Sequence, residues 1–182
     1  ATVSYQGSQN YNGSDTLTLI TTDSLGATGT DTVAITVNAV NDAPTAANAT
    51  LTVLEDSSKV LAASDFGFAD VDGHSLVSVK ITSLPTAGAL HLNGVAVSAN
   101  DTITKADIDA GKLIFTPAPG AHSTSYATLQ FKVIDSGSSN NESVSANTLT
   151  FDVTAVAPTQ TVQIGSMTKD SGTANADWIT AD

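Results

Sequence analysis

The chain has 182 residues, and 18 acidic side chains stand against six lysines and no arginine, which gives a formal net charge of −12. Nucleic-acid binding needs clustered basic side chains that displace counterions from phosphates, so this balance argues against nucleic acid and against an anionic membrane surface as partners. Cysteine is absent, which excludes a disulfide framework, and no apolar run is long enough to predict membrane insertion. The small, polar, cysteine-free composition favours an extracellular bacterial protein.

Two segments near the start, residues 15–20 and 32–37, alternate apolar and polar side chains with the period of two that is typical of β-strands. A short acidic joint follows, in which Asn41 and Asp42 precede Pro44. Proline fixes its own φ, cannot donate to a sheet ladder and pushes the residue before it towards extended geometry. We therefore expect a stiff, extended crossing between two units built from β-strands.

The β pattern continues after the joint. Residues 49–54 alternate, and the alternation in residues 75–81 predicts that Val77, Val79 and Ile81 share one face of a strand. Because side chains on one face of a strand point the same way, all three are expected to contact the core.

A hairpin is predicted where Asn93 and Gly94 separate two short apolar segments, since Asn-Gly is the strongest two-residue hairpin signal. A turn of this length places Leu92 opposite Val95, so that apolar side chains meet across the strands.

Three more strands are predicted by alternation, at residues 113–115, 128–133 and 148–153. The one helical candidate, residues 104–111, is about a turn long. About seven short strands in roughly 110 residues describe an all-β domain, and we predict a seven-stranded Greek-key β-sandwich.

The chain also repeats itself. Residues 17–23 match residues 129–135, and residues 33–37 match residues 149–153 at a slightly longer spacing. We therefore expect three parts: the end of a preceding unit (residues 1–43), one complete unit (44–156) and the start of a following unit (157–182). The sequence is then expected to be a slice of a longer array.

Several motifs resemble the cadherin-like repeats of large bacterial surface adhesins of the RTX type. They are Asn-Asp-Ala-Pro at residues 41–44, Leu-Glu-Asp at 54–56, Asp-Val-Asp-Gly at 70–73, and the longer stretches 84–94 and 108–117. The tail, residues 167–182, is similar to the opening of another Ig-like adhesin repeat. The resemblance implies a calcium-binding spacer repeat of a secreted bacterial adhesin, which contributes to cell adhesion or biofilm formation and is not an enzyme.

The resemblance also implies a Ca²⁺ ion at the joint between units, with Asn41, Asp42, Asp70, Asp72 and Asp135 as its ligands. The residue types agree, because calcium takes six to eight oxygen ligands without demanding tight geometry. Two positions apart in an extended segment, the Asp70 and Asp72 carboxylates point to one side. The alternative is that each aspartate forms a turn, a role that Asp often has.

Glu55 is implied as a ligand at the other end of the unit, towards the next joint. That joint, residues 155–158, lacks the Asn-Asp pair, so whether it binds calcium stays open, and the alternative for Glu55 is a solvated carboxylate.

Other site types have weaker support. The three histidines, His74, His91 and His122, are spread along the chain without the spacing of a zinc site, and Asp107 and Asp109 flank Ile108, which is expected to fill the core.

Two functional alternatives remain: a glycan- or protein-binding β-sandwich, and an accessory repeat of a secreted polysaccharide-active enzyme. The expected partners are adjacent repeats of the same chain, with a homophilic or host-surface ligand bound through other domains.

Overall fold

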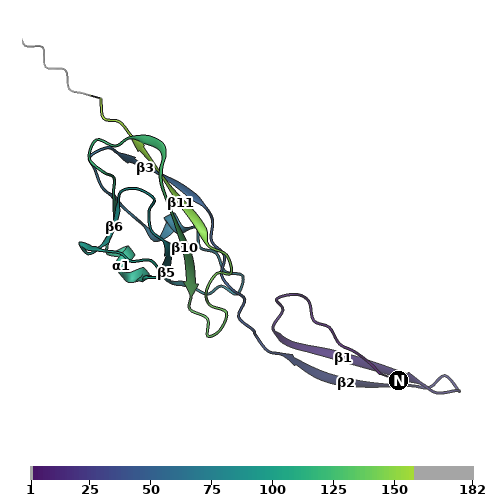
Figure 1. The fold of residues 1–182 in the computed structure, drawn as a ribbon. Helices are drawn as coiled ribbons and strands as arrows, with labels where there is room; N and C mark the ends of the chain where they lie inside the picture. The colour runs from purple at the N-terminus through teal and green to yellow at the C-terminus, as the bar shows by residue number, and fades with distance from the viewer. Residues whose placement is uncertain (1, 158–182) are drawn as a thin grey trace, which may run out of the picture.

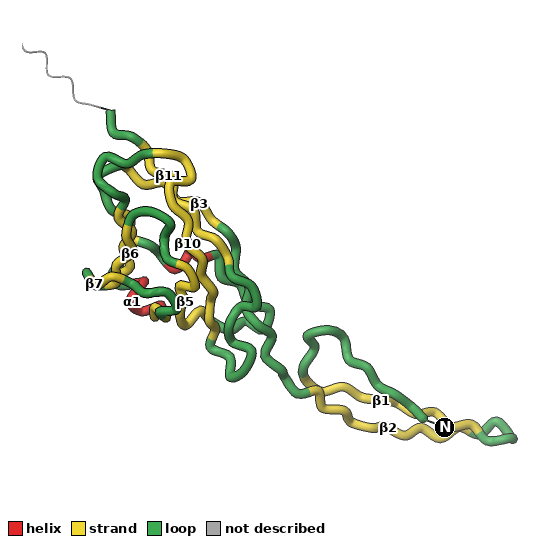
Figure 2. Tube along the Cα trace, in the orientation of Figure 1, coloured by secondary structure: helices red, strands yellow, loops and turns green. Residues whose placement is uncertain are grey.

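The computed structural model describes residues 2–157, so the predicted following unit at residues 157–182 lies outside the described residues except for Ala157. Figure 1 shows two parts in chain order: a hairpin of β1 (Gly13–Thr22) and β2 (Thr28–Val37), and a larger body that begins after the joint. Figure 2 shows that strands and loops make up almost all of both parts. Within residues 2–157, no helix has the length and apolar character needed to cross a membrane.

The larger body contains a five-stranded sheet in the order β3-β11-β10-β5-β8. β3 and β11 pair in parallel, and the other neighbours pair antiparallel. The strands are β3 (Ala49–Leu54), β5 (Leu76–Ser83), β8 (Thr102–Thr104), β10 (Ser123–Asp135) and β11 (Asn147–Thr154).

A second sheet of four strands, in the order β4-β9-β6-β7, packs against the first. Its strands are β4 (Lys59–Val60), β6 (Ala89–Leu92), β7 (Val95–Ala96) and β9 (Leu113–Thr116). Phe115 of β9 stacks on Phe151 of β11 with ring centroids 3.8 Å apart, so side chains of the two sheets meet directly. The predicted all-β sandwich is therefore confirmed, although this body has two strands more than predicted, β4 and β8, which are two and three residues long.

The core lies between the two sheets. Phe131 of β10 is fully buried and meets Phe66 edge-on, with ring centroids 4.9 Å apart. Phe66 belongs to a 3₁₀ turn, η1 (Ala63–Phe66), which the alternation of the sequence did not predict. The short helix α1 (Lys105–Asp109) buries Ile108 in this core, as predicted.

The prediction for the start of β5 is wrong at one residue. Val79 and Ile81 are buried, but the Val77 side chain is 47% exposed and Leu76 and Ser78 are buried instead. The pairing of β5 with β10 shifts register between Ile134 and Asp135, and such a bulge re-aims the side chains beside it.

The predicted hairpin around Asn93 and Gly94 is confirmed. Leu92 pairs with Val95, and both turn residues have positive φ, 51° and 80°, as a two-residue turn of this kind requires.

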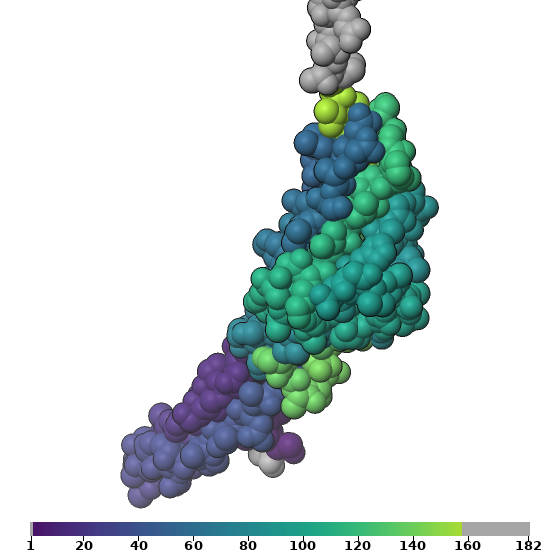
Figure 3. Space-filling view, turned by 90° about the vertical axis from the view of Figure 1, so that its left-hand side faces the viewer, coloured from purple at the N-terminus to yellow at the C-terminus, as the bar shows by residue number. Residues whose placement is uncertain are grey.

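The β1–β2 hairpin has the same register as the β10–β11 pair. Leu17 lies opposite Val33 in the hairpin, and Leu129 lies opposite Leu149 in the sandwich. These are the residues that the internal repeat of the sequence aligns. Figure 3 shows the hairpin as a narrow lobe projecting from one end of the sandwich, and apolar side chains on it stay open to solvent, with Ile20 69% exposed.

Candidate metal centre

Three segments that are distant in sequence meet at the end of the sandwich from which the hairpin projects. Asp135 is the last residue of β10, Asp70 and Asp72 lie in the loop between η1 and β5, and Asn41 and Asp42 follow β2. The backbone N–H of Asp42 donates to Asp72 Oδ2 at 2.7 Å. The Asn41 side-chain N–H group donates to the carbonyl of Ser139 at 2.7 Å and reaches Asp135 Oδ2 at 3.4 Å. The structure therefore brings the Asn41 side chain to Asp135 and the Asp42 backbone to the Asp72 carboxylate. The carboxylates of Asp70 and Asp135 also lie within 4.8 Å of each other.

Asp70 is held in a fixed orientation by its own loop. Its Oδ1 accepts hydrogen bonds from the backbone N–H groups of Asp72 at 3.0 Å and of His74 at 2.9 Å. The Asp70 side chain is only 1% exposed, and its other oxygen, Oδ2, is buried with no hydrogen-bond partner among the described residues. A buried carboxylate oxygen without a partner is costly, so this atom is a strong candidate to bind a cation.

Asp135 is held in a similar way. It is 2% exposed, and its Oδ1 accepts from the backbone N–H of Gly137 at 2.8 Å. Gly137 also makes room for the linker, because a Cβ atom at this position would lie 2.1 Å from Asn41 Oδ1. Any larger residue at position 137 would push the Asn41 amide away from Asp135.

Asn41 brings a second buried oxygen without a partner. Within the part of the chain that the structure describes, Asn41 Oδ1 is buried and accepts no hydrogen bond, whereas the amide nitrogen is surrounded by carbonyl and carboxylate oxygens. An open hollow of about 230 Å³ beside these groups is lined in part by Asn41, Asp72 and His74.

These donors fit a calcium ion. They are mainly carboxylate, amide and carbonyl oxygens, the set that calcium prefers. Two of them, Asp70 Oδ2 and Asn41 Oδ1, are buried and lack a hydrogen donor among residues 2–157. Asp70 and Asp135 also place two carboxylates within 4.8 Å of each other, which favours a positive charge between them.

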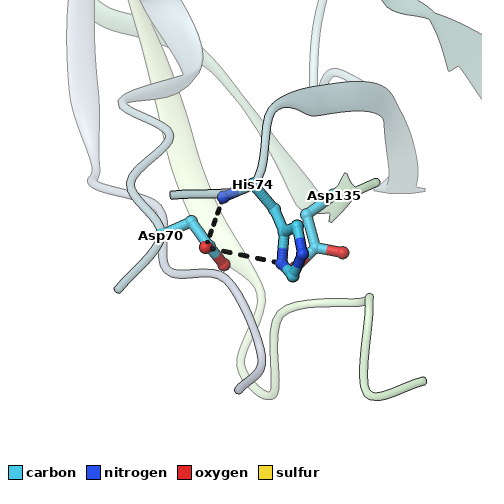
Figure 4. A group of neighbouring side chains, drawn as sticks. All are labelled: Asp70, His74 and Asp135. Carbon is cyan, nitrogen blue, oxygen red and sulfur yellow. Dashed lines mark hydrogen bonds and ion pairs between the residues drawn. The ribbon is translucent and has the colours of Figure 1, made fainter. Parts of the chain in front are cut away.

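His74 also belongs to this cluster. Its Nδ1 lies 3.8 Å from Asp70 Oδ1, and one donor atom from each of Asp70, His74 and Asp135 lies within 4.8 Å of the others. Figure 4 shows the imidazole between the loop of Asp70 and the end of β10. His74 was not predicted as a ligand, because the three histidines of the chain lack the paired spacing of a zinc site. The spacing of four between Asp70 and His74, across a turn at Gly73, is the signal that would have found it.

Glu55 lies apart from this cluster, beside the end of β11. Its Oε1 accepts from the backbone N–H of Val156 at 2.7 Å, and its Oε2 lies 2.9 Å from His122 Nδ1. Glu55 is thus occupied by protein groups where the chain leaves the sandwich.

Asp107 and Asp109 are both paired with lysines. Asp107 accepts from Lys112 at 2.7 Å, and Asp109 lies beside Lys105, so the two carboxylates act as local ion pairs around the buried Ile108.

The electrostatics of Asp70 lead to a pH prediction. The backbone N–H of His74, and next that of Asp72, hold the pKa of Asp70 below its usual range, against the opposing effect of burial. Because the pKa is lower in the folded state, this stabilisation is complete above the ordinary value of about 3.9 and is lost as the pH falls through the lower folded value. A carboxyl-carbon NMR titration of calcium-free protein should therefore give Asp70 a low midpoint. A midpoint at or above the ordinary value would contradict the hydrogen-bond geometry.

Comparison with known proteins identifies the sandwich. A family model described as cadherin-like matches residues 44–155, which is more than half of the chain. No match is found among curated proteins.

Proposed function

Because this chain belongs to the cadherin-like family, we propose that residues 44–155 are a calcium-binding spacer repeat, stiffened by Ca²⁺ at the joint that precedes it. Domains of this family typically bind calcium, are typically extracellular and interact with neighbouring domains. The proposed ligands at the joint are the linker pair Asn41 and Asp42 and the three sandwich carboxylates Asp70, Asp72 and Asp135.

One observation carries the proposal: Asp70 Oδ2 and Asn41 Oδ1 are buried and accept no hydrogen bond from residues 2–157, yet one belongs to the sandwich and the other to the linker. A cation bound by both would compensate their lost hydration. It would also tie the two parts of the chain together, because its ligands come from both sides of the joint.

Different residues orient the ligands and make room for the linker. The backbone N–H groups at positions 72, 74 and 137 orient the carboxylates of Asp70 and Asp135 before any ion binds. The small Gly137 admits the Asn41 side chain. The bound cation supplies the positive charge that these carboxylates lack. Without it, their mutual repulsion favours a more flexible joint.

The hairpin fits the proposed role of residues 1–43 as the end of a preceding repeat. Its register equals that of β10 and β11. The turn after β1 also resembles the turn after β10. Asp23 Oδ1 accepts a hydrogen bond from the backbone N–H of Leu25, two residues on, and Asp135 Oδ1 accepts one from Gly137 in the same way. A strand equivalent to β3 would then pair in parallel with β2, as β3 pairs with β11.

At the level of the whole protein, the proposed role is mechanical. An array of such joints would hold a binding module away from the surface of a bacterium, as part of a secreted adhesin that acts in cell adhesion or biofilm formation. The high acidic charge and the absence of arginine suit an extracellular spacer of this kind.

Calcium titration of the 182-residue protein tests the proposal. Calorimetry should show binding, and calcium at a hundred times its dissociation constant should raise the free energy of unfolding by about 2.7 kcal/mol. Asp70→Asn combined with Asp135→Asn should abolish most of this increase, because both changes remove charge from buried ligands.

The matched control is Asp109→Asn, which neutralises a half-exposed carboxylate paired with Lys105. It should leave the calcium-dependent increase unchanged. Identical melting temperatures in calcium and in chelator would contradict the proposed calcium site at the joint.

A further inference from the structure

Beside the proposed calcium ligands lies a further group that could bind a metal ion, the imidazole of His74. Its Nδ1 is buried and has no hydrogen-bond partner in the described part of the chain, although part of the ring remains open to solvent. A ring nitrogen that lies near two carboxylates but makes no hydrogen bond to either of them is well placed to share a metal ion with them.

The two carboxylates beside His74 are already oriented. One oxygen of Asp70 is fixed by backbone N–H groups, and one oxygen of Asp135 is fixed by the N–H of Gly137. The second oxygen of Asp70 has no hydrogen-bond partner among residues 2–157, and that of Asp135 has only the long 3.4 Å contact with the Asn41 amide. Hydrogen bonds of this kind hold metal-binding side chains in place and are a common feature of metal sites.

We propose that Asp70, His74 and Asp135 form a site for a divalent transition-metal ion such as Zn²⁺, distinct in its ligand set from the calcium site with which it shares two carboxylates. The donor atoms of the three residues lie within 4.8 Å of one another, and His74 Nδ1 is 3.8 Å from Asp70 Oδ1. A tetrahedral zinc ion with ligands at about 2.0–2.1 Å separates its donor atoms by roughly 3.4 Å, so side-chain movements of about 1 Å would close the site.

The nitrogen donor decides which ion this set prefers. Calcium takes oxygen ligands, whereas imidazole suits zinc and its first-row neighbours. His74 therefore adds nothing to calcium binding but completes a two-carboxylate, one-histidine set for zinc, with water at the remaining position.

The two sites differ in what they need from the linker. All three zinc ligands belong to the sandwich, whereas the proposed calcium site also uses Asn41 and Asp42. Since the ions share Asp70 and Asp135, zinc and calcium should compete. This competition is the only part of the inference that rests on the proposed function, because zinc binding itself requires no calcium site.

The experiment is a pair of calorimetric titrations, with ZnCl₂ and with CaCl₂, on the untagged 182-residue protein and on three variants. His74→Gln should weaken zinc binding at least about tenfold, a loss of the size seen when groups that support a metal ligand are removed. It should change calcium affinity less than about twofold. Asn41→Ala combined with Asp42→Ala should do the opposite, weakening calcium and leaving zinc unchanged.

His122→Gln is the matched control, because His122 also contacts a carboxylate, that of Glu55. It should leave zinc binding unchanged. Absence of zinc binding, equal zinc affinity of His74→Gln and the unaltered protein, or a loss of zinc binding only in His122→Gln would each overturn the inference. The calcium titrations of the same samples report on the calcium site independently, so failure of one proposal is distinguishable from failure of the other.

Discussion

Replacing Phe131 with alanine is expected to lower the free energy of unfolding by about 3–5 kcal/mol, the cost of deleting a buried aromatic ring and leaving a cavity. Phe131 lies in the middle of β10, is fully buried and packs edge-on against Phe66. η1 approaches the core through Phe66, so little of the cavity can be filled by neighbours without moving that turn.

Urea or thermal denaturation of calcium-free protein measures this loss without a contribution from metal binding. Val144→Ala is the control, because the Val144 side chain is 83% exposed and its truncation should change stability by no more than about 0.5 kcal/mol. A loss below about 1 kcal/mol for Phe131→Ala would contradict the position of Phe131 in the core.

Replacing Gly88 with alanine is expected to cost about 2–5 kcal/mol, from two effects that add. Gly88 has a φ of +73°, which is unfavourable for residues with a Cβ atom. A Cβ atom there would also lie 2.7 Å from the carbonyl oxygen of Thr116 and 3.0 Å from the Phe115 ring. The second contact would disturb the ring that stacks on Phe151 across the core.

Gly94→Ala separates the two effects. Gly94 has a similar φ of +80°, but no atom outside its immediate chain neighbours lies within 4 Å of the Cβ position. Its replacement should cost only the backbone term of about 1–2 kcal/mol. Equal losses for the two variants, measured by the same denaturation assay, would show that the contact with Thr116 and Phe115 is unimportant.

Strands with a regular two-residue period were predictable from the sequence, because that pattern depends only on neighbours along the chain. β10 and β11 are examples: their alternating apolar residues are the buried ones. The hairpin at Asn93 and Gly94 was predictable for a related reason, since a two-residue turn itself sets the register of the flanking strands. Ile108 was predicted as a core residue because it is the apolar residue between two acids.

Other features depend on contacts between distant segments. β4 and β8 are too short to show a period, and they are strands only because β9 and β5 pair with them. Val77 follows the alternation of β5 but points away from the core, because the bulge opposite Asp135 changes the direction of its side chain. The sequence of β5 alone contains no sign of that bulge.

For the candidate metal centre, too, part was predictable from the sequence and part depended on the tertiary structure. Residue types and motifs in the sequence determined which oxygen-bearing side chains were candidates, that the chain is built from β-strands, and that part of it repeats. Only the tertiary structure decided that Asn41, Asp70 and Asp135 meet, that His74 joins them and that Glu55 does not. The physical reason is that alternation and turn chemistry act between residues close in sequence, whereas a cation site requires side chains from three distant segments to converge where two parts of the chain meet.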